Sequence, residues 1–122
     1  MNNNIIPFPL EKTSPGILSM LEFLIEEAKI DKEINNWSSL SKKNPDRISF
    51  KNLMATVPDV LPVNNITSIA NIAKDFSVLS LYSIHTDQWN RKDLLGPLME
   101  LQSIAEKIAP TKLPEILKTN KD

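Results

Sequence analysis

Apolar residues recur at intervals of three and four along most of this sequence, in segments separated by nine prolines and only two glycines. Intervals of three and four place side chains on one face of a helix, whereas a half-buried strand requires an interval of two. Proline suits the first turn of a helix and interrupts its interior. The pattern therefore predicts an all-α protein whose helix boundaries are marked by prolines.

The first helix is predicted from Pro15 to about Asn35. Ser14 before Pro15 combines a capping side chain with a residue whose missing N–H costs nothing at a helix start. One apolar stripe follows, made of Ile17, Leu21, Leu24 and Ala28 and widened by Leu18 and Ile25. The acidic residues of this segment are expected to lie largely toward water: Glu22, Glu26, Glu27, Asp31 and Glu33.

Two further segments precede residue 86. Asn44-Pro45 predicts a short helix from Pro45 to Thr56 that buries Ile48, Leu53 and Val57, and residues 58–62 ("PDVLP") read as a turn or a single helical turn. A long, weakly charged helix is predicted from Asn64-Asn65 to His85. Its part 78–84 also alternates as a strand would, but no partner strand is evident, so a helix is preferred.

The fourth helix is predicted to begin between Thr86 and Lys92 and to end before Pro110. Leucines at 94, 98 and 101 give it the spacing of a helix packed along another helix, and Gly96-Pro97 predicts a kink or a break. A final helical turn is expected at residues 112–118. The predicted fold is thus a single-domain irregular bundle of four main helices plus short helical turns over residues 1–122, with an extended arm (1–13) and a loose tail (119–122).

The predicted core combines the apolar stripes of these helices. It consists of Leu18, Leu21, Leu24, Ile25, Ile69, Ile72, Ala73, Phe76, Leu79, Leu94, Leu98, Leu101 and Ile108.

Composition narrows the classes of function. The sequence has no cysteine, which excludes disulfides, thiolate metal sites and cysteine nucleophiles. The first twelve residues lack the pattern of a signal peptide, and the longest uncharged stretch, 60–73, is too short and polar to cross a bilayer, so a cytoplasmic protein without membrane contact is expected. A net charge of -1 without a basic stripe disfavours nucleic-acid binding.

Catalytic and metal-binding patterns are weak. His85, the only histidine, could act as a general base oriented by Asp87, so an enzyme using His85 is one alternative. No glycine-rich loop or activated nucleophile accompanies it, and a histidine near a helix C-terminus commonly interacts with the last carbonyls. Glu22 and Glu26 stand one turn apart, a spacing typical of a solvated helix face. We therefore expect no catalytic residue, no metal ligand and no cofactor.

The stretch "SIANIAKDFSVLSLYSI" at 68–84 resembles the start of a helix-turn-helix DNA-binding unit. The matching positions are Ile69, Ala70, Ile72, Ala73, Lys74, Phe76 and Val78. This resemblance implies a turn near Ser77 and a second helix that reads bases. Ser77 replaces the glycine of the turn, and the second helix would carry no arginine, lysine, glutamine or asparagine. DNA binding through residues 68–84 is the second alternative.

The corner between the third and fourth helices carries the best candidates for an interaction site. Trp89 combines a large apolar surface with a polar N–H, and two basic residues, Arg91 and Lys92, follow it closely in the sequence. Packing of Trp37 and Trp89 within their own chain is the preferred interpretation, and contact of Trp89 with a partner is the alternative. The candidate interaction residues are His85, Asp87, Trp89, Arg91 and Lys92. The preferred function is a small non-catalytic interaction or regulatory protein that binds an unknown protein partner or self-associates.

Overall fold

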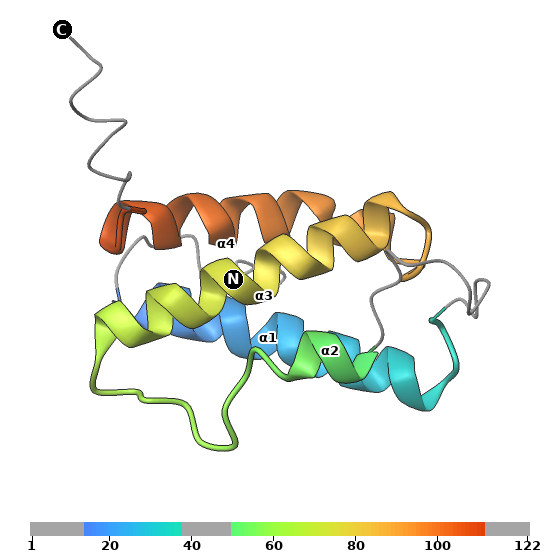
Figure 1. The fold of residues 1–122 in the computed structure, drawn as a ribbon, viewed down its shortest axis with the longest axis horizontal. Helices are drawn as coiled ribbons and strands as arrows, with labels where there is room; N and C mark the ends of the chain where they lie inside the picture. Colours follow the sequence, from blue (N-terminus) through green and yellow to red (C-terminus); the bar gives the residue numbers. More distant parts are fainter. Residues whose placement is uncertain (1–13, 38–49, 112–122) are drawn as a thin grey trace, which may run out of the picture.

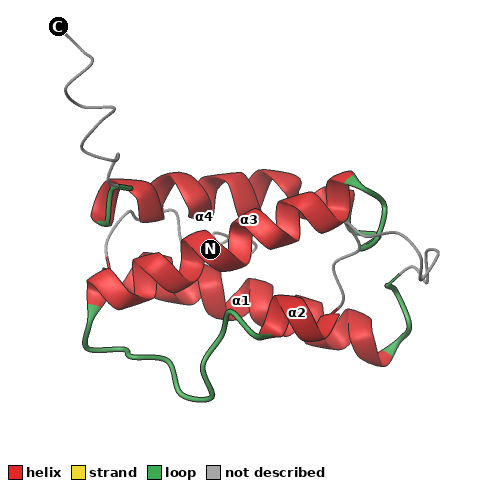
Figure 2. Cartoon of the chain, viewed as in Figure 1, coloured by secondary structure: helices red, strands yellow, loops and turns green. Residues whose placement is uncertain are grey.

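The computed structural model describes residues 14–37 and 50–111. Within these ranges the chain forms α1 (Ser14–Glu33), α2 (Phe50–Met54), α3 (Ile66–His85), a 3-10 helix η2 (Lys92–Leu94) and α4 (Leu95–Ile108). The three long helices extend along the long axis of the molecule (Figure 1). The described chain contains helices and loops and no strand (Figure 2), which confirms the all-α prediction.

Helix α3 is the central element of the bundle. It packs most extensively against α4, and it also contacts α1 and α2. Several of its buried residues are small: Ala70, Ala73, Ser77, Ser80 and Ser83. Small side chains let neighbouring helices approach closely, which accounts for the tight pairing of this helix with its neighbours.

Both ends of α3 follow from local sequence. At its start, where the sequence predicted a helix from Asn64-Asn65, the side chain of Asn65 accepts a hydrogen bond of 3.0 Å from the backbone N–H of Ser68 and caps the helix. The helix then continues without interruption to His85, so residues 78–84 are helical and not a strand. The same continuity leaves no turn at Ser77, and the helix-turn-helix expectation is wrong on this point.

The break near Gly96-Pro97 lies slightly earlier than the glycine. The 3-10 helix η2 ends at Leu94 and α4 begins at Leu95, which puts Pro97 in the first turn of α4. Proline is tolerated there because that backbone N–H has no partner within the helix. An α-helix continued from Lys92 would instead press the proline ring against the preceding turn.

The second predicted helix is described only in its later half. Helix α2 covers Phe50–Met54 and buries Leu53, while Val57 packs against the core from the following turn. Ile48 and the start of the predicted segment lie outside the described residues, as do the arm 1–13, the helical turn 112–118 and the tail 119–122. Residues 58–62 form an irregular loop with a bend at residues 59–60 and no helical turn.

The core matches most of the predicted list. Leu18, Ile72, Leu79 and Ile108 are partly buried and pack against it, and the other nine predicted residues are buried. The largest fully buried side chain, Trp89, was absent from the prediction. Among the described residues, no helix has the length and apolar character that crossing a membrane requires.

Candidate functional site

Helices α1 and α3 end in the same backbone motif. After α1, the N–H of Asn36 bonds to the carbonyl of Asp31 (2.7 Å) while Asn35 adopts a φ of 63°. After α3, the N–H of Gln88 bonds to the carbonyl of Ser83 (2.7 Å) while Asp87 adopts a φ of 62°. These are Schellman motifs, in which a left-handed residue ends the helix, and asparagine and aspartate tolerate that conformation better than most residues.

A tryptophan follows each motif at the same position. Trp37 comes two residues after Asn35, and Trp89 comes two residues after Asp87. The two segments meet as an isolated antiparallel bridge, and the two indole rings stack with centroids 4.8 Å apart and planes 9° from parallel. Phe50 contacts Trp37 edge-on at 5.8 Å. The matching helix ends therefore position an aromatic cluster.

The indole of Trp89 also bonds to α1. Its Nε1–H donates to Oδ2 of Asp31 at 2.7 Å, and the same oxygen accepts a bond of 3.0 Å from the guanidinium of Arg91. Both Trp89 and Asp31 are almost wholly removed from solvent. Burial of a carboxylate costs free energy unless hydrogen-bond donors compensate it, and these two bonds provide that compensation for Asp31.

Arg91 joins three carboxylates at this corner, which we call the Arg91 cluster: Glu27, Asp31, Arg91 and Asp93. Two parallel bonds of 2.9 and 3.0 Å connect Arg91 to Asp93, and a contact of 2.8 Å connects it to Glu27. The hydrogen bonds that Arg91 donates to Asp93, Glu27 and Asp31 raise the pKa of Arg91 despite its partial burial. The bond from Arg91 lowers the pKa of Asp93. The cluster fixes the start of η2 against α1.

The position of Asp31 corrects the sequence expectation for α1. Asp31 is 2% exposed and faces the bundle, and Glu27 is only partly exposed, whereas Glu22, Glu26 and Glu33 lie toward water as expected. Asp31 is buried because its hydrogen-bond donors, Trp89 and Arg91, come from a segment that is distant in the sequence.

The five candidate interaction residues occupy different environments. Trp89 is buried against its own chain, and Arg91 is largely enclosed by its carboxylates. Asp87 and Lys92 form an ion pair of 3.2 Å in which both side chains are 71% exposed, so the pair adds little stability. His85 is exposed at the last position of α3. The surface open to a partner thus includes His85, Asp87 and Lys92, but not Trp89.

His85 lines an apolar groove between α3 and α4, which we call the α3/α4 groove. It has a volume of about 520 Å³, and its lining is Leu81, Tyr82, His85, Leu95, Met99 and Gln102. Met99 is 59% exposed and Tyr82 is 37% exposed. Val78, one turn before Tyr82 on α3, is 48% exposed. The lining offers apolar contact with three polar groups, and no carboxylate.

The groove does not assemble the catalytic pair considered from the sequence. Asp87 is not part of its lining and bonds to Lys92 instead. The described residues also contain no group of three or more histidines, cysteines or carboxylates placed to hold a metal ion. Chemically, the arrangement suits binding of an apolar surface.

Sequence reasoning missed the residues contributed from a distance. Glu27 and Asp31 come from α1, and Leu95 and Met99 come from α4. One signal was present: "NNW" and "DQW" each place a tryptophan two residues after a possible left-handed position.

Comparisons with protein families, curated proteins and solved structures found no match for this chain.

Proposed function

We propose that this protein is a non-catalytic interaction protein whose α3/α4 groove receives an apolar helix from another protein chain. The observation that carries the proposal is the exposure of Met99 and Tyr82 at the rim of an apolar groove. Exposed apolar side chains gathered around a concave surface are typical of interaction sites.

The surroundings of the groove support this interpretation. The Arg91 cluster and the tryptophan stack hold the end of α3 against α1, next to the start of α4. A groove on helices held in this way is formed before a partner arrives, which reduces the entropy lost on binding. His85, Tyr82 and Gln102 supply the polar groups that orient a bound helix.

Site-specific photocrosslinking tests the proposal. A photoreactive phenylalanine analogue at Met99 is expected to form a protein adduct in cells. The same analogue at Ile34, which is 65% exposed directly after the end of α1 and is not part of the groove lining, serves as the matched control. Tyr82→Glu should abolish the Met99 adduct because it places a charge at the rim of the groove.

Sedimentation of the purified chain identifies the partner class. A dimer that Tyr82→Glu dissociates indicates a second copy of this chain, and a monomer combined with a specific Met99 adduct indicates a different protein. A monomer at every concentration, together with equal labelling from Met99 and Ile34, would overturn the proposal.

A further inference from the structure

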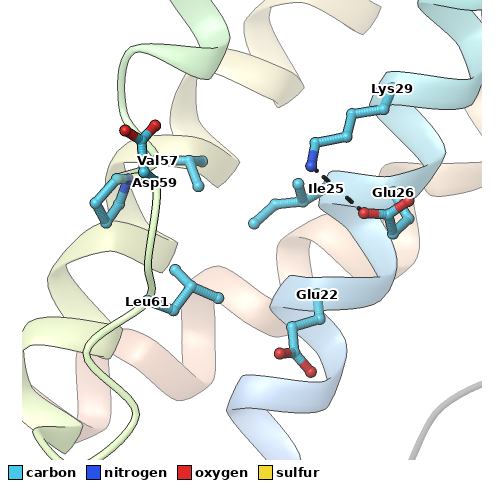
Figure 3. A pocket seen from close by; sticks show the side chains of 8 residues that line it. Glu22, Ile25, Glu26, Lys29, Val57, Asp59 and Leu61 are labelled. Carbon is cyan, nitrogen blue, oxygen red and sulfur yellow. Dashed lines mark hydrogen bonds and ion pairs between the residues drawn. The ribbon is translucent and has the colours of Figure 1, made fainter.

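A second groove lies between α1 and the loop that follows α2. It has a volume of about 310 Å³ and is lined by Glu22, Ile25, Glu26, Lys29, Val57, Pro58, Asp59 and Leu61. In Figure 3, Ile25 from α1 and Leu61 from the loop approach the space from opposite sides, and Glu22 extends from α1 toward the loop. We call this space the α1/loop groove. It is separate from the α3/α4 groove.

The loop wall is held in place by its own bonds. The N–H of Val57 donates to the carbonyl of Met54 at 3.0 Å, and the N–H of Val63 donates to Leu61 at 2.8 Å. Pro58 and Pro62 fix two further backbone angles. The floor is therefore a defined apolar surface formed by Ile25, Val57 and Leu61.

The charges around this floor are unbalanced. Three carboxylates line the groove against one ammonium group, that of Lys29. Lys29 contacts Glu26 at 3.5 Å, and both side chains are more than half exposed, so this pair is weak. Within the described part of the chain, Glu22 and Asp59 have no ion-pair partner. An apolar floor beside the carboxylates of Glu22 and the weakly paired Glu26 complements a ligand with an aliphatic stem and a cationic head.

We propose that the α1/loop groove binds an arginine side chain from a basic segment of a partner protein. Glu22 and Glu26 stand one turn apart on the same face of α1, a separation that a planar guanidinium with five donors can bridge. The three methylenes of arginine would lie along Ile25 and Leu61. A lysine ammonium offers a single point of charge and bridges two carboxylates less well.

An NMR titration of the full chain tests this inference with three peptides: acetyl-Leu-Arg-Leu-amide, acetyl-Leu-citrulline-Leu-amide and acetyl-Leu-Lys-Leu-amide. Citrulline has nearly the shape of arginine without its charge. The arginine peptide is expected to shift the methyl resonances of Ile25, Val57 and Leu61 and to bind more tightly than the other two. Binding should weaken as salt is added.

Matched variants locate the charge that matters. Glu22→Gln should raise the dissociation constant of the arginine peptide by up to about fivefold, the ratio that corresponds to one exposed ion pair. Asp59→Asn should have a smaller effect, because Asp59 points away from the gap (Figure 3). Glu33→Gln, at an exposed position near the end of α1, is the control and should change nothing.

Three results would overturn the proposal. Equal shifts from the citrulline peptide would remove the role of charge, and equal or tighter binding of the lysine peptide would remove the preference for arginine. No shift at Ile25, Val57 or Leu61 would remove the site. None of these results depends on the α3/α4 groove, so both proposals can fail independently.

Discussion

Trp37 and Trp89 stack face to face at the ends of two helices that are far apart in the sequence, with ring centroids 4.8 Å apart. Each ring arrives through the same helix-ending motif, but their N–H groups have different partners. The indole of Trp89 bonds to the buried carboxylate of Asp31 at 2.7 Å, whereas that of Trp37 bonds to the carbonyl of Ala28 at 3.4 Å. The two tryptophans are therefore alike in position and unequal in energetic importance.

Replacing each tryptophan by phenylalanine should expose this inequality. Trp89→Phe keeps an aromatic ring but removes a donor from a buried carboxylate, and should lower the free energy of unfolding by about 2 kcal/mol. Trp37→Phe removes a longer bond from a partly exposed ring and should cost less than about 1 kcal/mol. Urea unfolding followed by far-ultraviolet circular dichroism measures both. Equal losses would contradict the assigned role of Asp31.

Asp31→Asn tests the charge of the Arg91 cluster directly. The amide keeps the shape of the side chain but removes the charge that faces Arg91 and Trp89, and we expect a loss of about 2 to 3 kcal/mol. Glu33→Gln, on the same helix and exposed, should stay within about 0.5 kcal/mol of the parent. If the two variants unfolded at the same urea concentration, the burial of Asp31 would carry no energetic weight.

Two buried serines of α3 form a matched pair. The hydroxyl of Ser83 donates to the carbonyl of Leu79 at 2.8 Å, whereas the buried hydroxyl of Ser80 has no hydrogen-bond partner in the described part of the chain. Ser80→Ala should therefore raise the free energy of unfolding by about 1 kcal/mol, because it removes an unsatisfied polar group. Ser83→Ala gains the same helix propensity but loses a bond, so it should be less stable than Ser80→Ala in thermal unfolding. The reverse order would show that the Ser80 hydroxyl is satisfied.

Substitution of a left-handed residue by glycine should raise the free energy of unfolding. Asn35 has a φ of 63°, a conformation that glycine adopts without strain, so Asn35→Gly should stabilise the protein by about 0.5 to 1 kcal/mol. Asn71→Gly, in the middle of α3, is the control and should destabilise the protein by roughly 0.3 kcal/mol, the difference in helix propensity between the two residues. Differential scanning calorimetry of the two variants gives the comparison, and a loss at position 35 would argue against the motif.

Acidic pH should weaken the contact between Arg91 and Asp93. The bond from Arg91 lowers the pKa of Asp93 below its ordinary value of 3.8. A carboxyl group with a lowered pKa in the folded state contributes its full stability above 3.8, and that contribution is lost as pH falls through the lower folded-state value. The stability difference between the parent and Asp93→Asn should therefore be constant above pH 3.8 and shrink below it in pH-dependent urea unfolding. A difference that grew on acidification would contradict the ion pair.

The sequence predicted what depends on local pattern and missed what depends on contacts between distant segments. The start of α3 after Asn64-Asn65, the stripe of α1 and the break before Pro97 follow from neighbouring residues, and the structure confirms them. The burial of Asp31 does not, because an aspartate on an amphipathic helix is normally solvated and its donors come from another helix. Trp89 was expected to pack within its own chain, but its contacts could not be named for the same reason: Asp31 lies on α1 and Trp37 follows that helix.

Most of the polar and aromatic contacts that hold the helices together lie at one end of the bundle. The tryptophan stack and the Arg91 cluster join the end of α1, the end of α3 and the start of α4. At the opposite end of the bundle, Lys74 contacts Ala109 and Glu106. We expect amide hydrogen exchange to show a gradient, with fraying spreading from the Lys74 end toward the tryptophans. The α3/α4 groove lies at the end where we expect slow exchange. A helix that docks there would meet an ordered surface, so the disorder lost on binding would come mainly from the incoming chain.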